Sequence, residues 1–246
     1  MSNPFTGFLY FFQGMKLIFA PGVRRYVVIP LAINILLFAA LIWFGASQFQ
    51  VFMHWLMPEL PDWLQFLEWL FWILFGISAL LILFFTFSLL ANIIGGPFNE
   101  LLAEAVEFQL TGERPEDAGG MQKLLANIVP SMIDETKKLL YMVLWSIPFL
   151  ILFLIPVVNI VAPFIWIVFS AWMLTIEYTD YPMGNHGLRS DEQKHRLRGK
   201  RFLSLGFGGA VTIATIIPVL NFLVMPSAVA GATAMWVNQF KNIRET

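Results

Sequence analysis

Charged residues are scarce in this sequence, and cysteine is absent. Asp, Glu, Lys and Arg make up 13% of the 246 residues, whereas a soluble domain carries about 25%. Hydrophobic residues make up 58%, and a water-soluble core cannot hide that much apolar surface. The composition therefore predicts an integral membrane protein. The absence of cysteine excludes disulfides and thiolate metal sites.

Motifs for enzymatic chemistry are missing as well. The sequence contains no phosphate-binding Gly-x-x-x-x-Gly-Lys-Ser/Thr loop, no Gly-x-Ser-x-Gly nucleophile turn and no His-Glu-x-x-His zinc helix. Its three histidines are too few for a histidine-rich metal centre. We therefore expect no catalytic residues, no metal, no cofactor and no nucleic-acid partner. Any transport has to run on a gradient.

Four stretches without Lys, Arg, Asp or Glu exceed the roughly 20 residues that span hydrocarbon as a helix. They cover residues 26–58, 69–99, 139–176 and 202–240. The first two are predicted to be ordinary spanning helices. The second of these is expected to continue to about residue 111, with a kink at Gly95-Gly96-Pro97.

The third and fourth stretches are too long for one straight crossing, and they carry matching interruptions. Residues 155–161, Ile-Pro-Val-Val-Asn-Ile-Val, align with residues 217–223, Ile-Pro-Val-Leu-Asn-Phe-Leu. Proline disfavours helix at the preceding residue, while asparagine can cap the next helix. The pattern predicts a repeated helical hairpin, over residues 131–176 and 191–240. Each arm has about 17 residues or a little more, so two full crossings and a turn within the membrane both fit.

The N-terminal residues 4–20 are predicted to form a helix in the membrane interface. Asn3 before Pro4 is a good N-cap followed by proline at the first helical position. The few polar residues that follow form a narrow strip among aromatic and aliphatic ones. The predicted fold is a single all-α integral membrane domain: this interfacial helix, two long transmembrane helices, and two proline-broken hairpins that penetrate the membrane partly or fully.

The basic residues predict the orientation. All fifteen lie in the N-terminal segment, in residues 100–138, in residues 177–201 and in the tail. The connection around Glu59, Asp62 and Glu68 has none. Under the positive-inside rule this acidic connection is external, and both termini are cytoplasmic.

Gly22-Val23-Arg24-Arg25, directly before the first long helix, has the features of an anion site. A helix N-terminus presents unpaired amides and partial positive charge, and glycine lets the backbone curl around an oxyanion. Two arginines add donors suited to oxyanions. The same arginines suit a topology signal and an anchor for lipid headgroups, and the residues alone favour that simpler role.

Polar residues in or beside the apolar stretches are candidates for a pathway or gate. Polar side chains in membrane helices tend to face the bundle interior. The asparagines equally suit interhelical hydrogen bonds or caps, the glutamates a solvated helix face, and a lone loop histidine usually has no special role. The candidates are Asn34, Asn92, Glu100, Glu104, Asn159, His186 and Asn221.

The order and spacing of several motifs resemble those of the CysZ-type sulfate permeases of the bacterial inner membrane, over nearly the whole chain. These motifs are the interfacial helix, Gly22-Val23-Arg24-Arg25, Gly95-Gly96-Pro97-Phe98 followed by Glu100, Asp180-Tyr181-Pro182 with His186, and the two Ile-Pro-Val-x-Asn breaks.

This resemblance implies ATP-independent uptake of sulfate for assimilation into cysteine, by a permease or channel that is a homo-oligomer (a dimer or higher) among membrane lipids. It implies hairpins that only partly penetrate the bilayer. It also implies that sulfate binds at Gly22, Val23, Arg24 and Arg25, with Val23 standing where leucine is expected and contributing its backbone. The alternative is a non-transporting membrane scaffold or assembly protein, whose arginines hold lipid headgroups.

Overall fold

The computed structural model describes residues 3–56, 68–113 and 128–241, and these residues form helices and turns without a strand. This confirms the all-α class. The chain divides into two compact units, one of Val28–Pro97 and one of Met1–Val27 with Phe98–Thr246. The acidic connection predicted to be external falls mostly on residues 57–67, outside the described residues.

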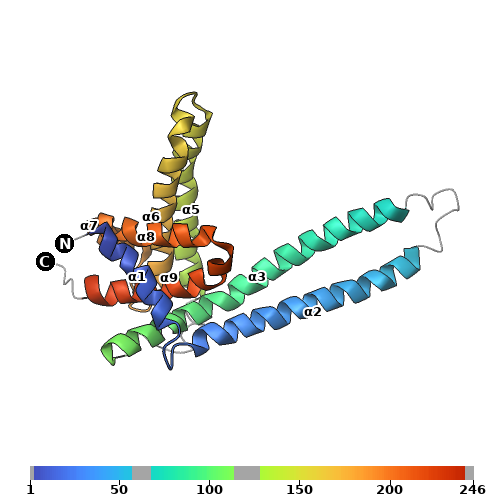
Figure 1. The fold of residues 1–246 in the computed structure, drawn as a ribbon, viewed down its shortest axis with the longest axis horizontal. Helices are drawn as coiled ribbons and strands as arrows, with labels where there is room; N and C mark the ends of the chain where they lie inside the picture. Colours follow the sequence, from blue (N-terminus) through green and yellow to red (C-terminus); the bar gives the residue numbers. More distant parts are fainter. Residues whose placement is uncertain (1–2, 57–67, 114–127, 242–246) are drawn as a thin grey trace. The chain divides into compact units, whose positions relative to one another are not determined.

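Two long helices supply the unit Val28–Pro97. They are α2 (Arg25–Leu56) and α3 (Glu68–Thr111), which run beside each other as a pair (Figure 1). Inside this unit the ring of Phe49 stacks on Phe75 at a centroid distance of 3.6 Å. No residue in the most apolar window of α2 is buried within the protein, so this surface suits contact with lipid.

The end of α3 lies where the sequence analysis predicts it, at about residue 111. The helix stops at Thr111, and Gly112 follows with a φ of 75°. This left-handed conformation is common just after a helix and favours glycine, which has no Cβ to clash.

The second unit is built around α1 (Pro4–Leu17), α8 (Arg201–Ile216) and α9 (Pro218–Gln239), which pack together (Figure 1). The Oδ1 atom of Asn3 accepts a hydrogen bond of 3.0 Å from the Phe5 amide, so the predicted N-cap is confirmed. One face of α1 is buried in the unit and the other exposes phenylalanine and leucine. Its position in the membrane interface stays a prediction.

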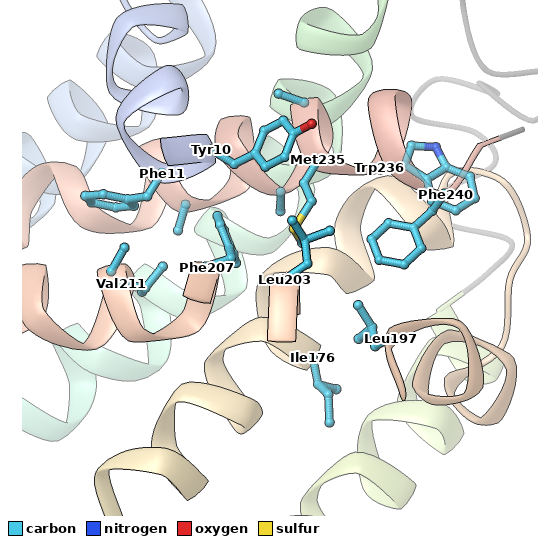
Figure 2. Packing of buried hydrophobic residues seen from close by; sticks show 14 of the residues in the cluster. Tyr10, Phe11, Ile176, Leu197, Leu203, Phe207, Val211, Met235, Trp236 and Phe240 are labelled. Atoms are coloured by element: carbon cyan, nitrogen blue, oxygen red, sulfur yellow. The ribbon is translucent and has the colours of Figure 1, made fainter. Parts of the chain in front are cut away.

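Aromatic and aliphatic side chains from several helices fill the core of this unit (Figure 2). Glycines let the helices approach closely: a Cβ atom on Gly14 would lie 2.0 Å from the Ser227 carbonyl oxygen, and one on Gly208 would lie 1.7 Å from that of Ala171. Small residues at helix contacts are typical of membrane proteins. The labelled core residues of Figure 2 are Tyr10, Phe11, Ile176, Leu197, Leu203, Phe207, Val211, Met235, Trp236 and Phe240.

The first predicted hairpin consists of α5 (Ile128–Leu154) and α6 (Ala162–Gly184), joined by a turn that contains the short helix η3 (Val158–Ile160). The helix α7 (Ser190–Gly199) then leads to α8. The helices extend past the predicted limits of the hairpin at both ends.

The second predicted hairpin has a much shorter break. Only Ile217, with φ of −90° and ψ of 109°, separates α8 from α9. Neither asparagine caps a helix: α6 begins without a side-chain cap, and Asn221 lies inside α9 because that helix already starts at Pro218. The predicted caps were wrong, since proline at the first helical position starts α9 without one.

Four helices among the described residues contain segments long and apolar enough to cross a membrane. The segments are Arg25–Phe49, Thr136–Leu154, Ala162–Gly184 and Leu220–Gln239.

Candidate functional site

The predicted anion site lies in the tight turn between α1 and α2. Gly22 has a φ of 87°, a left-handed conformation that glycine adopts without strain. The next side chain, Val23, is only 1% exposed and packs in a cluster with Leu102 and Val106 of α3 and Val229 of α9. The valine thus contributes more than its backbone, because its side chain fixes the turn to the core.

The backbone amides of the turn are only partly available to a ligand. The amides of Val23 and Arg24 both donate to the Ala20 carbonyl oxygen at 3.1 Å. Within the described part of the chain, no hydrogen bond is donated by the amides of Gly22 or Arg25. The site therefore offers two amides, fewer than a helix start alone would suggest.

The side chains of Arg24 and Arg25 are both exposed. The Nη2 atom of Arg25 donates a hydrogen bond of 3.0 Å to the hydroxyl oxygen of Tyr26. For Arg24, no side-chain hydrogen bond or ion pair occurs with any residue that the structure describes. Two guanidinium groups, two available amides and the positive end of α2 together have the chemistry to bind an oxyanion.

Glu100 and Glu104 lie on α3 beyond Pro97, and both are partly buried. The Nδ2 atom of Asn185 donates to the Glu100 carbonyl oxygen at 3.1 Å, which ties α3 to the end of α6. Burial, the charge of Asp180 and the charge of Glu104 raise the pKa of Glu100 to about 7. A carboxyl group with this pKa is protonated in a substantial fraction of molecules at neutral pH.

His186 contacts a glutamate that sequence reasoning did not select as a site residue. Its Nε2 atom lies 2.9 Å from both carboxylate oxygens of Glu107, whose side chain is 1% exposed. The Nζ atom of Lys241 lies 2.9 Å from the Oε1 atom of the same carboxylate. Burial raises the pKa of Glu107, but the hydrogen bonds and charges of His186 and Lys241 outweigh burial and lower it. The histidine therefore helps to join α3, the α6–α7 connection and the end of α9.

The predicted pathway residues belong to both units of the chain. Asn34 belongs to the unit Val28–Pro97, where it is partly buried, and its Oδ1 atom has no hydrogen-bond partner among the described residues. Asn92 lies on α3 in the same unit, and its side chain is outside the described part. Asn159 is exposed in the first break, and Asn221 is exposed in the first turn of α9. Glu100, Glu104 and His186 belong to the other unit.

Comparisons with known proteins cover nearly the whole chain. A family model described as Sulfate transporter CysZ/Etoposide-induced protein 2.4 matches residues 10–226. The chain is 45% identical over 234 residues to the Sulfate transporter CysZ of Pseudomonas fluorescens (strain Pf0-1), covering 95% of this chain and 94% of that protein. It is 44% identical over 234 residues to the Sulfate transporter CysZ of Pseudomonas syringae pv. tomato, covering 95% and 92%. The matched residues include every predicted site residue.

Proposed function

The chain belongs to the Sulfate transporter CysZ/Etoposide-induced protein 2.4 family, and on this premise we propose that it carries sulfate across a membrane without ATP hydrolysis. The observation that supports this proposal most directly is the 45% identity, over 95% of the chain, to a protein named as a sulfate transporter. The chain is a multi-pass membrane protein of a transporter family and not an enzyme.

Sulfate binds, in this proposal, at the turn formed by Gly22, Val23, Arg24 and Arg25. The available amides of Gly22 and Arg25 and the two guanidinium groups support this assignment. Each hydrogen bond to a charged group contributes about 1.5 to 3 kcal/mol. A dianion gains more from these donors and from the helix dipole than a neutral ligand would.

The path of sulfate past this turn includes, we propose, the carboxyl pair of Glu100 and Glu104. Two ionised carboxylates repel a dianion, and protonation of Glu100 near neutral pH lowers that repulsion. The asparagines at 34, 92, 159 and 221 are proposed to offer neutral polar contacts along the path. His186 acts through its contact with Glu107, which holds the end of α3 in place.

The setting of the protein is part of the same proposal. It functions in the bacterial inner membrane with both termini in the cytoplasm, supported by the basic residues at its ends and in two connections. It takes up sulfate for cysteine biosynthesis as a homo-oligomer surrounded by lipids. In this proposal the turn at 155–161, which has no charged residue, lies within the bilayer. Neighbouring copies in the homo-oligomer then cover its exposed backbone.

The transport proposal is tested with purified protein in liposomes. Radiolabelled sulfate should enter these vesicles faster than protein-free vesicles, without ATP, and unlabelled sulfate should compete. The non-transporting scaffold, with arginines that hold only lipid headgroups, predicts equal rates for both kinds of vesicle. Equal rates from correctly inserted protein would rule out the transport function.

A further inference from the structure

The two neighbouring arginines of the sulfate site are not equivalent. The guanidinium of Arg25 donates to the Tyr26 hydroxyl at 3.0 Å, and its Cζ atom lies 4.8 Å from the centre of the Tyr26 ring. A hydrogen-bond acceptor and an aromatic face thus act on one guanidinium. No described side chain restrains Arg24 in this way.

The Tyr26 ring is itself held by the core. It is partly buried and packs against the cluster that contains Ile18 and Val23. Val23 is fully enclosed in that cluster, so the ring and the sulfate-binding turn are fixed to the same packed residues. Tyrosine has only two side-chain torsions, so holding its ring in place costs little conformational entropy.

A held guanidinium binds an anion better than a free one. An arginine side chain carries about 2 kcal/mol of rotamer entropy, and part of this is lost when a ligand orders it. The Tyr26 hydroxyl occupies one N–H of Arg25 and leaves the other donors of the guanidinium for a ligand. The ordering is then already present before the anion arrives.

We propose that Tyr26 is a positioning residue of the sulfate site, which holds the Arg25 guanidinium in place for the anion. The inference rests on the proposed sulfate site and adds to it a residue that does not need to touch sulfate. In this proposal the hydroxyl of Tyr26 orders the side chain of Arg25 and not that of Arg24.

The experiment is a double-mutant cycle with sulfate as the titrant and calorimetry on detergent-solubilised protein as the readout. Tyr26→Phe keeps the ring and removes only the hydroxyl. It should weaken sulfate binding about 3- to 10-fold, the effect expected from freeing one side chain. The same change should have less than about a 2-fold effect in an Arg25→Lys background, which lacks the Nη2 donor, and its full effect in an Arg24→Lys background.

A matched tyrosine serves as the control. Tyr141 on α5 also accepts a hydrogen bond through its hydroxyl, from the Trp172 indole at 3.3 Å. Tyr141→Phe should leave sulfate affinity unchanged, and Tyr26→Phe should leave the midpoint of thermal unfolding within about 2 °C of the parent.

Two results overturn the positioning role: an unchanged affinity in Tyr26→Phe, or a loss of the same size in both lysine backgrounds. A failure of the site itself is recognised separately. In that case the Arg24→Lys, Arg25→Lys double variant, without any change at Tyr26, binds sulfate as the parent does.

Discussion

The two proline breaks have nearly the same sequence, yet they lie in very different surroundings. Around the first break, α5 and α6 protrude from the rest of their unit (Figure 1), and only 6% of the most apolar α5 window is buried. After the second break, α9 packs against α1 and α8, and 61% of its most apolar window is buried. The local sequence around the proline thus determines where a helix is interrupted. Tertiary packing determines how long the interruption is.

The contacts that hold the two hairpins differ in chemistry. The base of the first has a polar link: the Nζ atom of Lys138 on α5 lies 2.7 Å from an Asp180 carboxylate oxygen and 3.4 Å from one of Glu177, both on α6. The second is held mainly by apolar side chains and by glycines at helix contacts, and it has a polar contact at its base, where the Nζ atom of Lys200 donates to the Gln239 carbonyl oxygen at 2.5 Å. The hairpins should therefore respond to different substitutions.

The largest effect is expected from a methyl group at a close helix contact. Gly208→Ala places a Cβ atom 1.7 Å from the Ala171 carbonyl oxygen, so α6 and α8 must separate. We expect a loss of about 3 kcal/mol in the free energy of unfolding, at the upper end for overpacking. Thermal unfolding in detergent measures the loss.

The neighbouring residue provides the control. A Cβ atom on Gly209 meets nothing within 4 Å, and alanine is the better helix former by about 1 kcal/mol. Gly209→Ala should leave stability unchanged or raise it. Equal effects at the two positions would contradict the close packing of α8.

A smaller loss is expected at the polar base of the first hairpin. Lys138→Met removes the ammonium group from between two carboxylates, and we expect a loss of about 2 kcal/mol. Breaking a fully buried pair costs more, but Asp180 and Glu177 are partly exposed and water screens their charges. The exposed Lys16 is the control: Lys16→Met should change unfolding by less than about 0.5 kcal/mol. Similar losses of unfolding free energy in Lys138→Met and Lys16→Met would mean that the polar link at the base of the first hairpin adds no particular stability.

The smallest changes in the free energy of unfolding are expected from substitutions at the two breaks, and their signs should be opposite. Val157 has a φ of 73°, which costs a residue other than glycine about 1 to 2 kcal/mol. The side chain is 78% exposed, so Val157→Gly loses little packing. It should stabilise by about 0.5 to 1 kcal/mol, because glycine's greater freedom in the unfolded chain offsets part of the gain.

The aligned Val219 lies inside helix α9, where glycine is the poorer helix former. From the backbone alone, Val219→Gly should destabilise by about 0.5 kcal/mol. Equal signs for the two substitutions, in parallel unfolding measurements, would mean that the two breaks have the same backbone conformation.

Local chemistry made part of this fold predictable. The cap at Asn3, the end of α3 before Gly112 and the positions of both breaks follow from residues adjacent in sequence. The shortness of the second break was not predictable, because it depends on how α9 packs against α1 and α8. The two breaks differ in length although their sequences match.

The candidate site was predictable to a similar degree. Glycine and two arginines before a long helix suited an anion site but favoured a topology signal and lipid anchor, and the resemblance to sulfate permeases added sulfate. The burial of Val23 and the contact of His186 with Glu107 join segments far apart in sequence. No local pattern predicts such contacts.

Equilibrium binding of sulfate to an Arg24→Lys, Arg25→Lys double variant tests the sulfate site most directly. Lysine keeps the positive charge that supports membrane orientation and loses the forked donors. The control variant, Arg198→Lys with Arg201→Lys, changes two exposed arginines in the same way elsewhere. We predict that the first variant binds sulfate roughly 100-fold more weakly than the parent, and that the control binds as the parent does. Parental affinity in a correctly inserted Arg24→Lys, Arg25→Lys variant would contradict the sulfate site at the start of α2.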